Sequence, residues 1–278
     1  MPSQNRHKCG KLEKKNSQNG TKPANGWKSL KTVAQKNLIM NSGVGIILPT
    51  YCEAANIERL IEEIESLELN SRILVIDDSS FDGTSHIVRR IQRNYRNILL
   101  FVRPRKLGLG TAITDGFRIF LSLKKPPKYV VTMDADYSHN PKYIPQLVST
   151  VKEGADLAIG SRYCKGGETR NWSILRLFIS RIANFIAFTI IGAKISDYTS
   201  GFRCYSTRLI RNILNDLHSQ TYEIQIETIR QTHLRKLRIK DIPVTFTNRK
   251  KGKSKLTFNE IQQFLSYILL KSAVTRRR

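Results

Sequence analysis

The chain has 278 residues, of which 40% are hydrophobic, so it is long enough for one large α/β domain and too apolar for a disordered polyelectrolyte. Its 47 Lys and Arg residues against 22 Asp and Glu residues give a net charge of +25 and a pI near 10.2. This charge predicts an anionic partner: nucleic acid, an acidic membrane leaflet or a phosphorylated small molecule.

The spacing of the cysteines indicates a reducing compartment, and the apolar runs predict neither a signal peptide nor a membrane-spanning helix. No Cys-x-x-Cys pair occurs, so we expect neither a disulfide framework nor a zinc site, and a cytosolic setting fits best. The N-terminus lacks an apolar core of signal-peptide type. The longest apolar run, 182–193, is shorter than the ~20 residues of a membrane-spanning helix, so we expect none. The four cysteines are Cys9, Cys52, Cys164 and Cys204.

Positive charge concentrates at the two ends of the chain. Residues 1–42 carry a net charge of +8 and few apolar residues, which predicts a disordered basic tail. Residues 235–278 carry a net charge of +11. We expect a globular domain over 43–256, followed by an amphipathic helix with a basic end over 257–278.

Short apolar runs alternate with amphipathic segments from residue 44 onward, as in an α/β domain. The pattern predicts a doubly wound, mostly parallel sheet with right-handed crossovers, which binds ligands at the carboxyl ends of its strands. The apolar runs, each about as long as a buried strand, cover 44–48, 73–77, 98–102, 129–133 and 156–160. The segments with helical periodicity cover 54–68, 84–95 and 110–123.

The pattern loosens after residue 160. Residues 161–173 are polar and contain glycine, which predicts a mobile loop. Residues 174–193 and 257–275 each predict a long apolar helix with flanking cations. We expect both helices to lie in a membrane interface, with their cations toward lipid phosphates, rather than to pack as ordinary core helices.

Acidic residues follow the first two predicted strands. Glu53 follows the first strand, and the adjacent Asp77 and Asp78 end the second. Helix capping explains an acid such as Asp82 but not two adjacent ones. We therefore expect Glu53 and Asp78 to accept hydrogen bonds from the base or ribose of a nucleotide. A Gly-x-Gly at 108–110, before a predicted helix, is compatible with close approach to a phosphate.

The fourth predicted strand runs into Asp134-Ala135-Asp136. Two carboxylates one residue apart at a strand end can point into the same space, where they repel each other unless a cation lies between them. Mg²⁺ or Mn²⁺ suits such hard oxygen ligands and the oxygens of a diphosphate. His139 follows closely and is expected to hydrogen bond within the turn.

The motifs of this sequence together resemble a known family. The motifs that carry the resemblance are, in order, PTYCEAANI, IDDSSFDGT, KLGLGTA, MDADYSHNP, GSRYCKGG with NWS and the following Arg and Ser, DYTSGFRCYS, YEIQIE and RKKGKSK. Through these motifs the chain, over about 44–270, resembles dolichol-phosphate (polyprenol-phosphate) mannosyltransferases, family-two inverting glycosyltransferases with the GT-A nucleotide-diphospho-sugar transferase fold.

The resemblance implies a set of site residues. It implies that Asp134 and Asp136 bind the metal, that these two residues with Arg162 and Arg249 are catalytic, and that Arg162 and Arg176 bind the acceptor. The chain departs from the usual pattern at Cys52 and at 79–81, which leaves the nucleotide and sugar preference open. The implied donor-binding residues are Pro49, Tyr51, Glu53, Ile76, Asp78, Asp134, Ala135, Asp136, Arg162, Arg249 and Lys255.

The resemblance also implies an activity. It implies metal-assisted, inverting transfer of mannose from GDP-mannose to dolichyl or polyprenyl phosphate, giving a β-linked product. One alternative is a polyprenyl-phosphate glucosyl- or N-acetylhexosaminyltransferase that uses a UDP-sugar. A more distant alternative is a basic nucleic-acid-binding protein, although the sequence has no motif for specific nucleic-acid recognition.

The same resemblance implies a place in the cell. We expect a peripheral protein on the cytosolic face of a membrane: the endoplasmic reticulum in a eukaryote or the plasma membrane in a prokaryote. Relatives without spanning segments rely on small membrane-anchoring subunits. This chain resembles them, or it binds the membrane surface through its two amphipathic helices and its basic ends.

Overall fold

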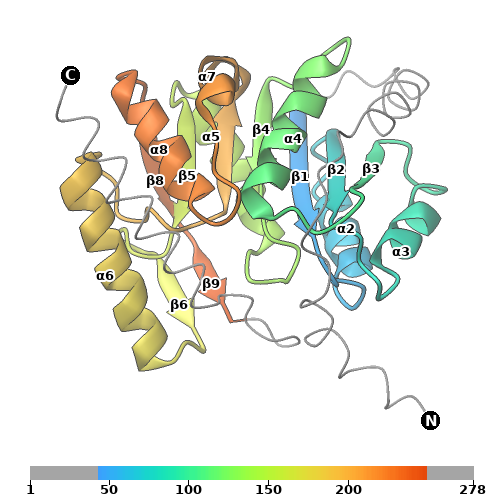
Figure 1. The fold of residues 1–278 in the computed structure, drawn as a ribbon, viewed down its shortest axis with the longest axis horizontal. Coiled ribbons are helices and arrows are strands. Elements are labelled where there is room, and N and C mark those ends of the chain that lie inside the picture. The colour runs from blue at the N-terminus through green and yellow to red at the C-terminus, as the bar shows by residue number, and fades with distance from the viewer. Residues whose placement is uncertain (1–42, 249–278) are drawn as a thin grey trace.

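A seven-stranded sheet forms the centre of the protein (Figure 1). The structure is a computed structural model and describes residues 43–248. The five strands expected from the apolar runs are all present. The strands of the sheet are β1 (Val44–Thr50), β2 (Ser71–Asp77), β3 (Ile98–Val102), β4 (Tyr129–Thr132), β5 (Leu157–Ser161), β7 (Arg203–Ser206) and β8 (Ile239–Pro243).

The strand order is β3-β2-β1-β4-β7-β5-β8. Neighbouring strands are parallel except at β7, which runs antiparallel to both β4 and β5. The mostly parallel α/β sheet predicted from the sequence is therefore confirmed. The antiparallel strand was not predicted, because Arg203–Ser206 is short and has polar residues at both ends.

Helices cover both faces of the sheet, and each face has its own core. Residues of α2, α3 and α5 pack with alternate strand residues such as Ile46 on one face. Residues of α4, α7 and α8 pack with Ile47 on the other, since successive side chains of a strand point to opposite faces. The helices are α2 (Ile57–Glu65), α3 (Thr84–Ile91), α4 (Leu109–Ser122), η2 (Pro141–Tyr143), α5 (Ile144–Lys152), α6 (Ile174–Ile191), α7 (Thr207–Ile213), η3 (Leu214–Asp216) and α8 (Ile224–Leu234).

The predicted loop 161–173 is partly a strand. Within it, β6 (Glu168–Arg170) pairs in parallel with β9 (Thr245–Thr247) and forms a separate two-stranded sheet beside α6 (Figure 1). The sequence did not show β6, because a three-residue polar strand has no apolar periodicity. The pairing holds the segment before α6 against the strand that ends the described chain.

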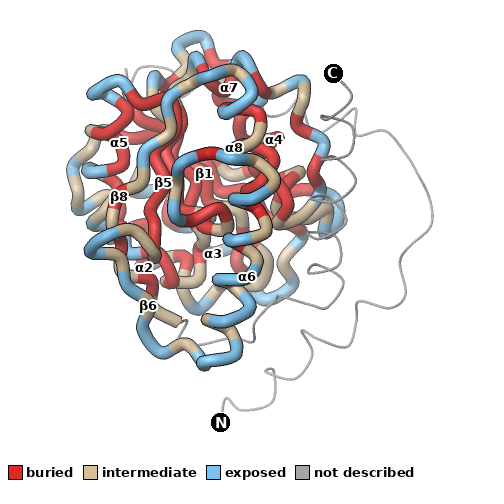
Figure 2. Tube along the Cα trace, turned by 90° about the vertical axis from the view of Figure 1, so that its left-hand side faces the viewer, coloured by how far each residue is buried: buried red, intermediate tan, exposed pale blue. Residues whose placement is uncertain are grey.

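Helix α6 lies at the edge of the domain and is largely exposed (Figures 1 and 2). Only Asn184 and Ala187 of its 18 residues are buried. Its mean hydropathy is 1.8, so among the described residues it is the one helix long and apolar enough to cross a membrane. The apolar helix predicted over 174–193 is therefore confirmed, and it includes Arg176 and Arg181 as well as the apolar residues from 182 onward. The predicted basic tail 1–42 and C-terminal helix 257–275 lie outside the described residues.

Candidate active site

The ends of β1 and β2 lie side by side. Their last residues, Thr50 and Asp77, are paired in register. The Thr50 hydroxyl donates to Asp77 Oδ1 (2.9 Å), and the backbone amide of Asp78 donates to the Thr50 carbonyl (3.0 Å). The donor residues expected on these two strands therefore lie at one edge of the sheet; they are Pro49, Tyr51, Glu53, Ile76 and Asp78.

An aromatic surface with an adjacent cation lies at this edge. The rings of Tyr51 and Phe81 pack edge to face, with 6.4 Å between their centres. Lys106 Nζ lies 4.6 Å from the centre of the Tyr51 ring. Cys52 has a left-handed backbone (φ 57°), and its amide donates to Ser80 Oγ (2.8 Å). A planar base and the phosphates of a nucleotide are chemically suited to such a surface.

Asp78 is part of a buried ion pair. Its carboxylate accepts hydrogen bonds from the guanidinium of Arg103 and from the amides of Leu107 (3.2 Å) and Gly108 (3.1 Å). The other end of the Arg103 guanidinium donates to Thr111 Oγ1 (2.7 Å) and the Gly108 carbonyl (2.8 Å). Asp78 therefore fixes the loop that leads into α4. Any contact with a nucleotide is made from a carboxylate that this network already orients.

The Gly-x-Gly at 108–110 packs against the protein itself. Gly108 has a φ of +95°, and a Cβ there would lie 2.5 Å from the Gln220 carbonyl oxygen. A Cβ at Gly110 would collide with the backbone of Ser219, and the Gly110 amide donates to the Gln220 carbonyl (2.9 Å). Close packing against 219–220 thus accounts for both glycines, although their spacing is also compatible with close approach to a phosphate.

The segment Asp134-Ala135-Asp136 begins two residues after β4 ends. The backbone amide of Asp134 donates to His139 Nδ1 (3.0 Å), and the amide of Ser138 donates to Asp136 Oδ1 (3.0 Å). Ala135 is buried between the two acids. Tyr137, the next residue, has a left-handed backbone (φ 63°). The turn therefore holds both carboxylates at the strand end, as predicted.

His139 is a buried part of this turn, as expected. Its ring stacks on Phe202 (5.0 Å between ring centres) and meets the edge of Phe246 (5.3 Å). Burial lowers the pKa of His139 to about 4, although the charge of Asp136 acts in the opposite direction. The imidazole is thus neutral at pH 7. Its Nδ1 is occupied by the Asp134 amide, so its role is to shape the turn.

The turn residues fit a small divalent cation. Among residues 43–248, no group of three or more His, Cys, Asp or Glu side chains is arranged to hold a metal ion. Mg²⁺ commonly binds through one or two carboxylates, with substrate phosphates and waters as the remaining ligands. Asp134 and Asp136, both partly exposed on one turn, match that donor set.

Arg162 follows β5 and forms a bidentate ion pair with Asp197. Nε and Nη2 lie 2.7 Å from the two carboxylate oxygens, and the Arg162 amide donates to Oδ2 (3.1 Å). Burial would raise the pKa of Asp197, but the charge and hydrogen bonds of Arg162 hold it below the ordinary value. The Arg162 side chain is only 7% exposed, so its orientation is fixed by the protein.

Trp172 connects the two arginines expected to bind the acceptor. The guanidinium carbon of Arg176 lies 4.1 Å from the centre of the indole, and that of Arg162 lies 5.1 Å from it. The indole Nε1 is buried and has no hydrogen-bond partner within the described chain. Arg176 Nη1 donates to Asn248 (2.9 Å), the last described residue. Arg249 and Lys255 lie outside the described residues.

The two arginines expected to bind the acceptor are connected to the carboxylate turn through Phe246. This ring lies 5.4 Å from the guanidinium carbon of Arg162 and 5.3 Å from the ring of His139, which in turn binds the amide of Asp134. The structure therefore brings Asp134, Asp136, Arg162 and Arg176 into one continuous region, as the sequence implied.

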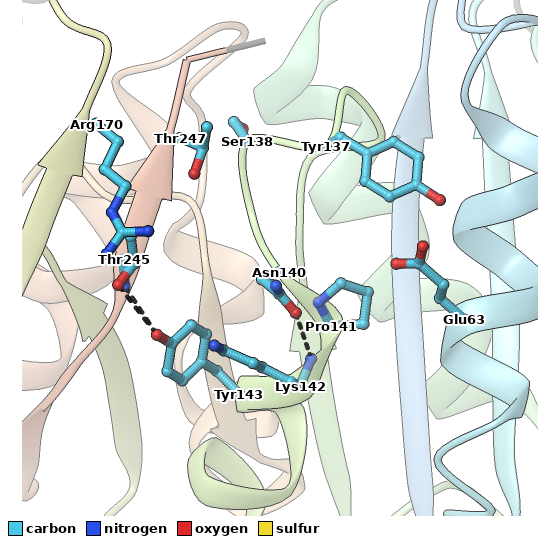
Figure 3. Close-up of a pocket in the computed structure, with 10 residues that line it drawn as sticks. All are labelled: Glu63, Tyr137, Ser138, Asn140, Pro141, Lys142, Tyr143, Arg170, Thr245 and Thr247. Atoms are coloured by element: carbon cyan, nitrogen blue, oxygen red, sulfur yellow. Dashed lines mark hydrogen bonds between the residues drawn. The ribbon is translucent and has the colours of Figure 1, made fainter. Parts of the chain in front are cut away.

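A polar cavity of about 180 Å³ lies beside the same turn (Figure 3). In Figure 3 Glu63 and Tyr137 border one side, and Arg170 and Thr247 border the other. Its lining offers hydroxyl, amide and charged groups, so it is suited to water or polar ligands and not to a lipid chain. The lining residues are Glu63, Tyr137, Ser138, Asn140, Pro141, Lys142, Tyr143, Arg170, Thr245 and Thr247.

Comparison with known proteins identifies the class of enzyme. The family model for glycosyl transferase family 2 matches residues 45–214. The chain therefore belongs to glycosyltransferase family 2, and the expected resemblance is confirmed. It is a glycosyltransferase.

Two characterised relatives extend over most of the chain. Polyprenol monophosphomannose synthase of Mycolicibacterium smegmatis is 34% identical over 220 residues, which cover 78% of this chain and 82% of that protein. Dolichol-phosphate mannosyltransferase of Pyrococcus furiosus is 32% identical over 229 residues, which cover 81% of this chain and 62% of that protein.

Solved structures confirm the GT-A fold. Glucosyl-3-phosphoglycerate synthase of Mycobacterium tuberculosis, in complex with Mn²⁺, UDP and glucosyl-3-phosphoglycerate, superposes with a TM-score of 0.60. The two proteins are 19% identical, and the match covers 91% of this chain and 86% of that one. Mannosyl-3-phosphoglycerate synthase of Rubrobacter xylanophilus is 17% identical with a TM-score of 0.56, and covers 88% of this chain and 76% of that one.

Proposed function

We propose that this glycosyltransferase transfers mannose from GDP-mannose to dolichyl or polyprenyl phosphate. The observation that carries the proposal is the pair of guanidinium groups, Arg162 and Arg176, that share the ring of Trp172 at the start of an exposed apolar helix. Guanidinium groups suit the phosphate of such an acceptor, and an apolar helix suits its lipid chain and the membrane. The two relatives at 34% and 32% identity are named for this type of transfer.

The donor would lie over the ends of β1, β2 and β4. The surface of Tyr51 and Phe81 would receive the base, and Pro49, Glu53 and Ile76 would complete its surroundings. Asp78, which Arg103 orients, would accept hydrogen bonds from the base or ribose. The diphosphate would then reach the Asp134–Asp136 turn, with the Ala135 backbone beside the donor.

The carboxylates of Asp134 and Asp136 would hold the divalent cation, Mg²⁺ or Mn²⁺. When bound, such an ion neutralises the charge that develops on the departing diphosphate. Arg162, and in our proposal Arg249 and Lys255, would add positive charge toward the same phosphates. The GT-A fold neighbour from Mycobacterium tuberculosis contains Mn²⁺ together with UDP, which agrees with this assignment.

The acceptor phosphate would act as the nucleophile. A phosphate monoester has a second pKa of about 6, so at pH 7 it is mostly a dianion and needs no general base. Its oxygen attacks the anomeric carbon while the bond from that carbon to the nucleoside diphosphate breaks, so the configuration inverts and a β-linked product forms. Arg162 and Arg176 would orient the phosphate for this in-line attack, and orientation is a large part of such catalysis.

The protein would act at the cytosolic face of a membrane. The side chains of Ile174, Leu175, Phe178 and Phe185 are exposed on α6 and would enter the lipid interface. In our proposal the basic ends 1–42 and 257–278 add attraction to anionic lipids, with or without small membrane-anchoring subunits, and the catalytic unit spans 43–256. Each Lys or Arg near an anionic leaflet contributes about 1 kcal/mol.

A donor screen tests the function. The purified full-length protein is incubated with polyprenyl phosphate in vesicles and with either GDP-mannose or UDP-glucose, with Mg²⁺ or Mn²⁺ or with chelator. With metal present, we expect a mannosyl-phosphate lipid from GDP-mannose and no product from UDP-glucose. With chelator, we expect no product from either donor. Turnover of UDP-glucose with none of GDP-mannose would overturn the donor assignment, and no lipid product with either donor would overturn the acceptor.

A further inference from the structure

Helix α6, although mostly apolar, has a stripe of polar residues on one face. Arg176, Ser180 and Asn184 follow one another at intervals of four residues, so they lie on one face of the helix. Asn184 is 8% exposed, whereas its neighbour Phe185 is 67% exposed. The stripe therefore faces the domain, whereas large apolar side chains such as Phe178, Phe185 and Phe188 are exposed.

Asn184 uses its whole side-chain amide to hold the neighbouring segment. Its Oδ1 accepts a hydrogen bond from the backbone amide of Tyr198 (2.6 Å). Its Nδ2 donates to the Ser180 carbonyl (2.8 Å) and to the hydroxyl of Thr199 (3.3 Å). A buried amide in an apolar helix is costly unless its partners are present, so this position is specified by the contacts to 198–199.

The Thr199 hydroxyl joins α6 to the ion pair of the site. It accepts from Arg162 Nη2 (2.5 Å) and from Asn184 Nδ2 (3.3 Å), and it donates to Asp197 Oδ1 (3.2 Å). A hydroxyl has one proton and two lone pairs, so these three bonds use its full capacity. The hydrogen bonds thus run without a gap from the helix to the guanidinium of Arg162.

This chain of hydrogen bonds fixes how Arg162 presents its remaining donors. Nε and Nη2 are directed to Asp197 and Thr199, whereas Nη1 has no hydrogen-bond partner among residues 43–248. Rotation of the guanidinium would break both bonds of Nη2. Nη1 therefore points in a direction set by Asp197 and Thr199 together.

We propose that Thr199 and Asn184 are positioning residues, through which α6 sets the direction in which Arg162 Nη1 meets the acceptor phosphate. The inference rests on the proposed function, since that function assigns the acceptor phosphate to Arg162. A second connection supports it: Tyr163, which follows Arg162, donates its hydroxyl proton to Ser180 Oγ of the same stripe (2.7 Å). The helix that would lie in the membrane thus contacts Arg162 through Asn184 and Thr199, and it contacts Tyr163 through Ser180.

The test compares two identical substitutions. Thr199→Val removes the hydroxyl that binds Arg162. Thr189→Val removes a hydroxyl of α6 whose one hydrogen bond among residues 43–248 is to the Ile186 carbonyl of its own helix. The dissociation constant of farnesyl phosphate is measured by calorimetry, together with KM for polyprenyl phosphate and for GDP-mannose.

We expect Thr199→Val to weaken farnesyl phosphate binding and to raise the acceptor KM roughly tenfold, since a hydrogen bond to a charged group is lost. The KM for GDP-mannose rises less than the acceptor KM, because in the proposed function the donor is also held by the strand-end residues and the carboxylate turn. Thr199→Ser restores acceptor binding, and Thr189→Val changes neither constant. Asn184→Asp, which keeps an acceptor for Tyr198 but cannot donate to Thr199, gives an intermediate loss.

Wild-type acceptor constants in Thr199→Val would overturn the inference, as would an equal rise in both KM values with a lower Tm. Failure of Thr199→Ser to restore binding would do the same. If Thr199→Val does not fold, Asn184→Asp decides the question, and unchanged acceptor binding in that variant overturns the inference. A wild-type protein that binds farnesyl phosphate but transfers no mannose would instead contradict the proposed function.

Discussion

The guanidinium carbon of Arg176 lies 4.1 Å from the centre of the Trp172 ring, which also lies 5.1 Å from the guanidinium carbon of Arg162. Two cations repel each other, and an aromatic ring that contacts both of them offsets part of that repulsion through its electron-rich face. The ion pair with Asp197 already offsets much of the charge of Arg162, and the ring lets the guanidinium of Arg176 lie at the same site. In the proposed function, the acceptor phosphate would be an anionic partner for both guanidinium groups.

Replacing the Trp172 ring should therefore weaken acceptor binding. In Trp172→Leu the two arginines lose their shared ring, and we expect the KM for polyprenyl phosphate to rise about tenfold, from cation–π contacts of about 0.5–2 kcal/mol. Steady-state kinetics at saturating GDP-mannose measure this change. Trp172→Phe keeps an aromatic face and should recover most of the loss. A Trp172→Phe variant as impaired as Trp172→Leu would contradict the role given to the ring.

Asp136→Asn should abolish transfer without unfolding the protein. The substitution keeps the oxygen that accepts from the Ser138 amide but removes the charge that, in our proposal, holds a divalent cation. We expect activity to fall by at least about 100-fold, on the scale of losses seen when a group that stabilises the transition state is removed. The binding of Mn²⁺, measured by electron paramagnetic resonance, should weaken in parallel.

The matched control for Asp136→Asn is Asp216→Asn. Asp216 is half exposed and forms an ion pair with Arg235, away from the carboxylate turn. This variant should keep wild-type activity and Mn²⁺ binding. A folded Asp136→Asn protein with wild-type turnover would remove the metal assignment.

The exposed phenylalanines of α6 should determine binding to lipid. Burial of a Phe side chain is worth about 1.5–3 kcal/mol, so Phe178→Ser and Phe185→Ser should each lower the vesicle partition coefficient by about tenfold or more. Co-sedimentation with vesicles of zwitterionic and anionic lipids measures the coefficient. Leu234→Ser, at a residue 48% exposed on α8, should leave it unchanged. Equal losses in all three variants would indicate that α6 has no particular role.

Much of the fold could be predicted from the sequence, because strands and helices produce local patterns of apolar residues. Buried strands such as β2 are uninterrupted apolar runs, and α2 places Ile57, Leu60, Ile61 and Ile64 on one face. The antiparallel β7 and the short β6 were missed. Their positions depend on pairing with residues distant in the chain, and four or three residues carry no periodic pattern.

Of the candidate site, the sequence predicted the charged residues but not the residues that contact them. Asp134, Asp136, Arg162 and Arg176 could be named from motifs, and the structure brings them together. Two partners in the site could not be named because they are distant in the chain: Arg103 lies 25 residues from Asp78, and Asp197 lies 35 residues from Arg162. Trp172 is close to Arg176 in the chain, but the sequence does not show that its ring contacts both arginines. The sequence contained only indirect signals for these residues: a basic residue directly after β3, the Trp of the NWS motif, and the Asp that begins DYTSGFRCYS.

Asp241 on β8 should cost the fold stability at neutral pH. One oxygen accepts from the Ser196 amide, and the other is buried without a partner in the described chain. Burial raises the pKa of Asp241, and the nearby charge of Asp197 acts in the same direction. The folded-state pKa of Asp241 lies above its unfolded-state pKa, so between these two pKa values the folded protein binds more protons than the unfolded protein. The contribution of Asp241 to stability therefore falls as the pH rises through that interval.

Asp241→Asn removes the charge, so we expect the free energy of unfolding to rise by about 1 kcal/mol at pH 7.5. The gain should shrink as the pH falls through the raised pKa of Asp241, because the wild-type carboxyl then loses its charge as well. Urea unfolding of both proteins at pH 7.5 and pH 4.5 measures it. A variant less stable than the wild type at pH 7.5 would show that the charge is needed, with Arg203 as its partner.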